Sequence, residues 1–345
     1  MTRRILFGLL VLGPAVVVVD LLGASDMVLF VLAAVALIPL AWLIGEATEH
    51  AAHHTGPGVG GFLNATFGNA PELIIALFAV NEGLTEVVRG SLSGSVIGNL
   101  LLVLGFSLLF GGRGKLDRES SFISLALVAL ATLLFLIPSI PGWDGDPERH
   151  SLARLSLPVS IVLLLVYLAV TAYTLRRHRR LHVTEEGGDF RAWSLPVAMV
   201  VLAAATVVTA FVAEILVHTL ETFAEKAHLT DFFVAAVIVA IVGNAAEHGG
   251  AVVVAARGKI TLAAEIALAS SAQVAVFLIP AVALIAWAID PLALSFRPVE
   301  IVVLGSSTLF AALILWGGNS SRARGALLIA AYVSAAVAFF LAGDR

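Results

Sequence analysis

Long apolar runs separated by short polar segments occupy almost the whole of this 345-residue chain. A helix needs about 20 apolar residues to cross the hydrocarbon layer of a bilayer, and the runs have about this length. The breaks contain ordinary turn residues, as in Gly56-Pro57-Gly58 and Asp290-Pro291. The pattern predicts eleven membrane-spanning helices, at residues 5–22, 27–45, 58–80, 86–110, 119–138, 153–175, 194–219, 228–255, 261–289, 297–317 and 323–342.

The composition agrees with a membrane protein. Charged residues make up 13% of the chain and the mean hydropathy is +1.02, whereas soluble domains have about 25% charged residues. The N-terminal run follows Arg3 and Arg4, is longer than the apolar part of a signal peptide, and lacks a good cleavage site. We therefore expect an uncleaved first span and an all-α polytopic protein in the bilayer.

Lys and Arg residues are divided unequally between the two sets of loops. Fourteen of the 20 lie on the side of the N-terminus and six on the other. Because cytoplasmic loops are enriched in these residues, we predict a cytoplasmic N-terminus and an external C-terminus. The composition, which lacks Cys, favours a prokaryotic inner membrane.

The two halves of the chain share a motif. A shift of 175 residues aligns Gly68-Asn69-Ala70 with Gly243-Asn244-Ala245 and places Glu72 opposite Glu247. We call residues 68–72 the first motif and residues 243–248 the second motif. The same register divides the chain into a leading helix (1–25), a first five-helix repeat (26–175), a charged cytoplasmic linker (176–193) and a second five-helix repeat (194–345). Because five is odd, the second repeat must cross the membrane in the opposite direction, as in the inverted repeats of secondary transporters.

Interrupted helices are expected at both motifs. Pro71 removes a backbone donor inside the third span and Gly68 loosens the same turn. In the eighth span the proline is replaced by Ala246, but glycines flank the motif. Transporters with inverted repeats bind their substrate at such interruptions, near the middle of the bilayer.

Glu72 and Glu247 are the strongest candidates for chemistry. An ionised carboxylate at membrane depth costs about 2.5–3.5 kcal/mol on insertion scales, so it needs a partner or a proton. Two carboxylates that face each other repel, and one divalent cation or one proton relieves the repulsion. With Asn69 and Asn244 adding amide oxygens, these residues form the predicted calcium site, because Ca²⁺ prefers six to eight hard oxygen ligands. Since protons would compete for the same carboxylates, the site is sufficient for exchange.

Further polar residues lie near the motifs. His248 follows Glu247 and either helps to carry protons or is a neutral structural imidazole. Polar residues of the helices that follow each motif are predicted to line the site, or simply to permit close packing; they are Ser95, Asn99, Ser270, Ser271 and Gln273. Glu46, Glu49 and Glu221 lie nearer the water, where they either admit ions and protons or are ordinary solvated residues.

These motifs resemble a known family. Residues 61–74 and 94–105, with Gly243-Asn244-Ala245-Ala246-Glu247-His248 and Ser270-Ser271-Ala272-Gln273, look like the two repeats of the calcium/proton exchangers, the cation/proton exchanger branch of the calcium/cation antiporter superfamily. The resemblance covers essentially the whole chain. It implies that Glu72 and Glu247 bind calcium and accept protons, with the neighbouring amides assisting.

The predicted function is therefore export of calcium from the cytoplasm in exchange for protons, by alternating access. Calcium is the substrate; no cofactor, enzymatic activity or nucleic-acid partner is expected, and homo-oligomerisation is compatible with this interpretation. A sodium/calcium or manganese exchanger of the same superfamily is the first alternative. An intramembrane metallohydrolase is a remote one, because it would need at least two clustered His ligands at membrane depth and His248 is the only His well inside a predicted span.

Overall fold

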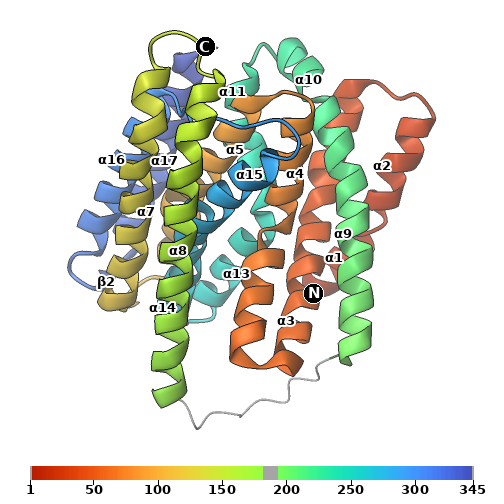
Figure 1. Cartoon of the computed structure of the whole chain (residues 1–345). Helices are drawn as coiled ribbons and strands as arrows, with labels where there is room; N and C mark the ends of the chain where they lie inside the picture. Colours follow the sequence, from red (N-terminus) through yellow and green to blue (C-terminus); the bar gives the residue numbers. More distant parts are fainter. Residues whose placement is uncertain (1, 182–192, 344–345) are drawn as a thin grey trace.

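The computed structural model describes residues 2–181 and 193–343. Within these ranges it does not describe the side chains of residues 2–3, 56–62, 64–65, 174–181 and 246–248. The described chain is almost entirely helical, as predicted, and most helices run along a common axis (Figure 1). The exception is a two-residue antiparallel pairing between β1 (Gly114–Lys115) and β2 (Asn319–Ser320).

Helices of the first half begin with the leading pair α1 (Thr2–Leu9) and α2 (Leu12–Leu21). They continue with α3 (Asp26–Gly68), α4 (Ala70–Asn81), α5 (Thr85–Ile97), a π-helix (Gly98–Val103), α6 (Leu104–Gly111), α7 (Arg118–Ser139), a 3₁₀ turn (Ile140–Gly142) and α8 (His150–Leu181).

Helices of the second half are α9 (Leu195–His218), α10 (Leu220–Ala227), α11 (Asp231–Phe233), a π-helix (Val234–Val239), α12 (Ala240–Gly243) and α13 (Ala245–Ala256). They end with α14 (Ile260–Gln273), a π-helix (Val274–Leu278), α15 (Ile279–Ala286), α16 (Pro298–Leu315) and α17 (Arg322–Ala342).

The number of continuous spans is smaller than predicted. Among the described residues, nine helices are long and apolar enough to cross a membrane, or ten if α10 and the segment 231–243, bent by 110°, count as one. The expected count of eleven is therefore not confirmed. The predicted spans missing from the nine are 58–80 and 228–255, which contain the two motifs and are interrupted at Asn69 and Asn244. The turn expected at 55–58 does not interrupt the chain, because α3 continues through these residues as a helix.

The two halves match in the helices that follow the motif breaks and in the segments after them. Adding 175 to the bounds of α4 gives the bounds of α13, and adding it to residues 85–111 gives residues 260–286. Both of these longer segments contain a π-helix after their first 13 or 14 residues. Such local widening of a helix is frequent at functional sites. The repeat seen in the sequence is thus a repeat of structure.

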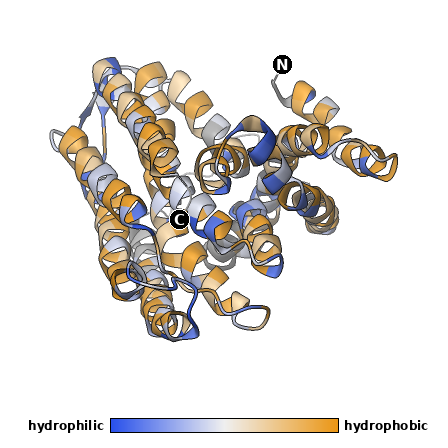
Figure 2. Cartoon of the chain, turned by 90° about the horizontal axis from the view of Figure 1, so that it is seen from above, coloured by the Kyte–Doolittle hydropathy of each residue, from blue (hydrophilic) through white to orange (hydrophobic). Residues whose placement is uncertain are grey.

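Close helix crossings bring the halves together. α5 packs against the π-helix at residues 234–239, and a Cβ on Gly94 would lie 2.0 Å from the carbonyl oxygen of Ala236. Glycine is therefore required at position 94 for the two backbones to approach this closely. The outward-facing helices are largely hydrophobic, while more polar segments lie between them (Figure 2).

A buried extended connection, residues 291–297, links α15 to α16 across one end of the bundle. It has no regular structure, yet Ala293, Leu294 and Phe296 are completely buried. Its backbone is satisfied by side chains: Ser139 of α7 donates to the carbonyl of Leu294 (3.2 Å) and accepts from the amide of Phe296 (3.0 Å). These bonds offset the cost of burying irregular backbone.

Candidate cation-binding site

Two single-residue breaks create the centre of the site. Asn69 (φ −100°, ψ 18°) separates α3 from α4, and Asn244 (φ −87°, ψ 5°) separates α12 from α13. Both depart from α-helical geometry, so a new helix N-terminus begins after each Asn. Pro71 therefore lies in the first turn of α4, where its missing N–H is tolerated, and not inside a helix as expected. The helix is interrupted at Asn69, two residues before the position that Pro71 predicts.

Glu72 connects the two motifs. It lies in the first turn of α4, where the helix dipole favours a negative charge, and only 6% of it is exposed. A Cβ placed on Gly243 would lie 3.1 Å from the Cγ of Glu72 and 3.5 Å from its Cδ. The carboxylate of the first motif therefore lies against the residue that precedes Asn244. The sequence-based expectation that the two motifs meet is fulfilled at this contact.

Buried amides and hydroxyls link the halves beside Glu72. The amide nitrogen of Asn244 donates to Ser95 Oγ (2.8 Å) and to the carbonyl of Ala240 (2.9 Å). The amide nitrogen of Asn99 donates to Asn244 Oδ1 (3.1 Å) and to Ser270 Oγ (3.1 Å). The network therefore joins α5 and the π-helix after it to the break at Asn244 and to α14, and it links the two halves of the chain.

One amide oxygen of this network is not used as a hydrogen-bond acceptor by the described residues. Asn99 Oδ1 is buried and accepts no hydrogen bond from the described residues. A buried acceptor without a donor costs about 1–3 kcal/mol, and an oxygen of this kind suits a hard cation. Asn69, at the first break, is also fully buried.

Other predicted residues lie outside the network. Ser271 donates to the carbonyl of Ala267 in its own helix (2.9 Å), and Gln273 is hydrogen-bonded to Tyr167 of α8. The register explains why Gln273 and Asn99 differ: a shift of 175 places Gln273 opposite Gly98, and Asn99 opposite Val274. The side chains of Glu247 and His248 lie outside the described residues, although their backbone forms the first turn of α13.

The predicted ion-access groups are separate from the centre. Glu46 is half-buried and lies 3.5 Å from Nε2 of His50, while Glu49 and Glu221 are exposed. His50 itself is buried, stacks on Trp193 at a centroid distance of 4.3 Å, and accepts from the Trp193 backbone N–H (3.2 Å). Sequence reasoning missed this contact, because the two residues are 143 positions apart.

A second buried polar cluster was also missed. Arg89, counted among loop cations from the sequence, is 1% exposed and donates to Glu148 (2.6 Å) and to the carbonyl of Ala293 (3.2 Å). Glu300 is completely buried and accepts from Ser93 Oγ (2.7 Å) and from the backbone N–H of Arg297 (2.8 Å). A glutamate near the start of the apolar run 297–317 was the only sequence signal for this cluster.

Apolar helices of membrane-spanning length, with the polar groups of two repeated motifs gathered where two broken helices meet, are typical of a secondary membrane transporter. Comparison with known proteins agrees. The model of the family described as "Sodium/calcium exchanger protein" matches residues 25–176 and 197–341. The chain belongs to this family.

Named relatives cover nearly the whole chain. It is 40% identical to the Ca(2+)/H(+) antiporter ChaA of Bacillus subtilis (98% of this chain, 99% of the relative). It is 35% identical to the vacuolar cation/proton exchanger 1 of Arabidopsis thaliana (95% of this chain, 76% of the relative). The solved structure of native YfkE superposes with a TM-score of 0.84 at 37% identity, covering 97% of this chain and 99% of that one. The crystal structure of an H+/Ca2+ exchanger CAX, 16% identical with a TM-score of 0.73 and covering 99% of this chain and 92% of that one, shares the fold.

Proposed function

We propose that this protein is a calcium/proton antiporter of the membrane, and that Glu72 is central to its ion site. The observation that carries the proposal is the contact of Glu72 with Gly243, which places a buried carboxylate of one repeat on the broken helix of the other. The names of the full-length relatives, Ca(2+)/H(+) antiporter and cation/proton exchanger, support calcium and protons as the exchanged ions.

The residues present suit calcium. Glu72 supplies negative charge, and Glu247, in the equivalent turn of α13, supplies the second carboxylate in this proposal. Amide oxygens come from Asn69 and Asn244, and Asn99 Oδ1 adds an acceptor that the described residues leave unused. Together with water, these groups supply the oxygen ligands that Ca²⁺ prefers.

Protons and calcium exclude each other at such a site. Two carboxylates held in a buried position cannot both remain ionised without a counter-charge, so they bind either a divalent cation or protons. Inverted repeats allow the site to be exposed first to one face of the membrane and then to the other. Competition combined with alternating access is sufficient for antiport, and His248, next to Glu247, is proposed to assist proton movement.

A sodium/calcium or manganese exchanger is the second candidate, because the family description names sodium and calcium. Hydrolysis has less support. Among the described residues there is no group of three or more His, Cys, Asp or Glu side chains that could hold a metal ion, and the relatives are named as transporters.

Flux in proteoliposomes tests the proposal. An imposed pH gradient is expected to drive calcium uptake by the wild type, and a sodium gradient alone is not. Glu72→Gln is expected to reduce uptake at least a hundredfold, because the neutral amide keeps the shape but loses the charge and the proton site. Glu225→Gln, which alters an exposed carboxylate of α10, is the matched control and should leave uptake unchanged. Proton-driven uptake that survives in Glu72→Gln would contradict the assignment.

A further inference from the structure

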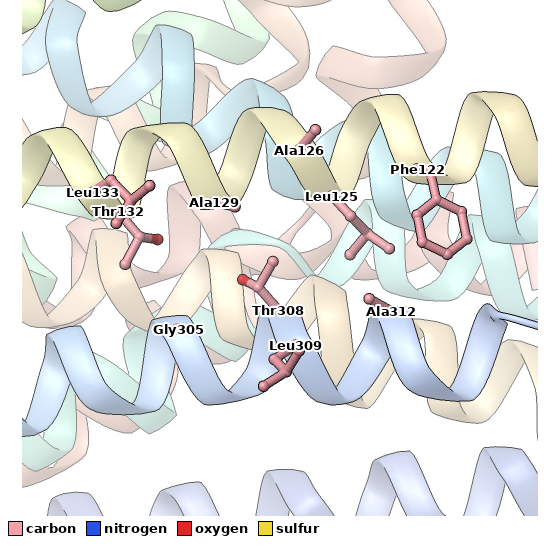
Figure 3. A pocket seen from close by; sticks show the side chains of 10 residues that line it. All are labelled: Phe122, Leu125, Ala126, Ala129, Thr132, Leu133, Gly305, Thr308, Leu309 and Ala312. Atoms are coloured by element: carbon pink, nitrogen blue, oxygen red, sulfur yellow. The ribbon is translucent and has the colours of Figure 1, made fainter.

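An apolar groove lies between α7 and α16, away from the ion site (Figure 3). Its volume is about 380 Å³, within the usual range of about 300–1,000 Å³ for small-molecule sites. Leu125 and the two threonines Thr132 and Thr308 are buried in its floor, while Leu133 and Leu309 are each 63% exposed at its sides. Since α7 and α16 are both membrane-spanning helices, the groove opens toward lipid.

Small residues form the hollow. A Cβ placed on Gly305 would meet nothing within 4 Å, and Ala126 also lines the groove. The threonine hydroxyls are bonded within their own helices: Thr132 donates to Val128 and Thr308 to Leu304, both at 2.8 Å. The groove therefore has no hydroxyl hydrogen left to donate to a ligand. Its surface suits a hydrocarbon chain.

Aromatic and cationic side chains follow at one end of the groove. Phe122, which lines it, packs edge-to-face on Trp316 with ring centroids 5.8 Å apart. The guanidinium carbon of Arg118 lies 6.0 Å from the centre of the Trp316 ring. Arg118, the first residue of α7, and Trp316, the residue that follows α16, are each one helical turn beyond the groove. A Trp beside an Arg at the end of a span is typical of the lipid headgroup level.

The β1–β2 pairing concentrates positive charge at this end. It joins the connection before α7 to the connection before α17. These connections and the first turns of the two helices contain Arg113, Lys115, Arg118, Arg322 and Arg324. The nearby acidic residues are Asp117, which caps α7 by accepting from the Ser120 amide (3.2 Å), and Glu119. The cluster keeps an excess of positive charge, on the side that the Lys and Arg distribution predicts to be cytoplasmic.

We propose that the groove and this basic end together form a binding site for one anionic phospholipid. An acyl chain occupies the groove between α7 and α16, and Arg118 with the neighbouring cations binds the phosphate. Basic residues between membrane helices on the cytoplasmic side are a known way to bind anionic headgroups. The charge selects an anionic lipid over a zwitterionic one, and the groove retains it.

Native mass spectrometry of the whole protein in detergent tests this site. The protein is incubated with equal amounts of phosphatidylglycerol and phosphatidylcholine that have the same acyl chains. The wild type is expected to retain one lipid and to prefer phosphatidylglycerol at least fivefold. Arg118→Gln is expected to bring this preference close to parity. Gly305→Leu, which fills the groove, is expected to lower the retention of both lipids.

Matched variants separate the site from general effects. Arg4→Gln removes an exposed cation of α1, and Ala169→Leu introduces a leucine on an exposed face of α8; both should behave as wild type. If Gly305→Leu does not fold, Ala126→Leu fills the same groove. Equal retention of the two lipids by the wild type, or unchanged retention in the filled groove, would overturn the proposal. The proposal would also be overturned if the wild type formed a dimer in place of binding lipid, and if filling the groove abolished that dimer.

Discussion

Glycine at position 243 matters because of what lies next to it. A methyl group there would be 3.1 Å from Glu72 Cγ, so the carboxylate would have to move by a few tenths of an ångström. A cation site depends on ligand distances of about 2.3–2.6 Å. The position of Glu72 is therefore set by the absence of a side chain on the other repeat.

Gly243→Ala should weaken calcium binding without unfolding the protein. We expect about a tenfold rise in the calcium concentration for half-maximal uptake, equivalent to about 1.4 kcal/mol. Gly249→Ala is the matched control, because a Cβ at Gly249 of α13 meets nothing within 4 Å and alanine favours a helix. Equal calcium dependence of the two variants, measured in proteoliposomes, would show that the contact does not position Glu72.

At the scale of elements, the extended connection at 291–297 depends on side chains from three helices. Arg89 of α5 donates to Ala293, Ser139 of α7 bonds Leu294 and Phe296, and Ser156 of α8 accepts from Leu294 (2.8 Å). Arg297 at its end donates to the carbonyls of Ala342 and Gly343 (3.1 and 2.8 Å), at the C-terminus of α17 where a cation is favoured.

Arg89→Met should therefore destabilise the fold. Methionine fills much of the space, but the buried carbonyl of Ala293 loses its donor, at a cost of about 1–3 kcal/mol. Thermal unfolding followed by tryptophan fluorescence is expected to show a lower Tm by several degrees. Arg154→Met, an exposed cation of α8, serves as the comparison and should leave Tm nearly unchanged. An equal shift in both would remove the special role of Arg89.

At the scale of the whole molecule, the sequence was enough to predict helices in a bilayer, the repeat and the meeting of the motifs. A carboxylate inside an apolar run, such as Glu72, can be recognised from the sequence alone. The first break lies at Asn69, two residues before Pro71, because backbone geometry depends on packing. Arg89 was misjudged because its partners, Glu148 and Ala293, lie 59 and 204 positions away.

The orientation in the membrane remains a prediction and is easily measured. The chain contains no Cys, so single cysteines can be introduced without background. Lys115→Cys in β1 is expected to react with a membrane-permeant maleimide only, and Lys226→Cys in α10 also with an impermeant one added to intact cells. Both positions are exposed. The reverse pattern would invert the predicted topology and place the basic loops outside.

For an antiporter built from two inverted repeats, identical halves would give the inward-open and outward-open conformations equal free energies, because exchanging the halves converts one conformation into the other. The connection at 291–297 removes this equality. Arg89 and Glu300, which bond this connection and form a polar clamp on it, correspond to Ala264 and Leu125 at the 175-residue offset, so the clamp has no counterpart at the matching positions of the other repeat. Opening its end of the bundle breaks these bonds, whereas the other end is joined by a different set that includes the β1–β2 pairing. A difference of about 1.4 kcal/mol would already populate one state tenfold over the other, and the protein at rest would then be closed on the side of the clamp.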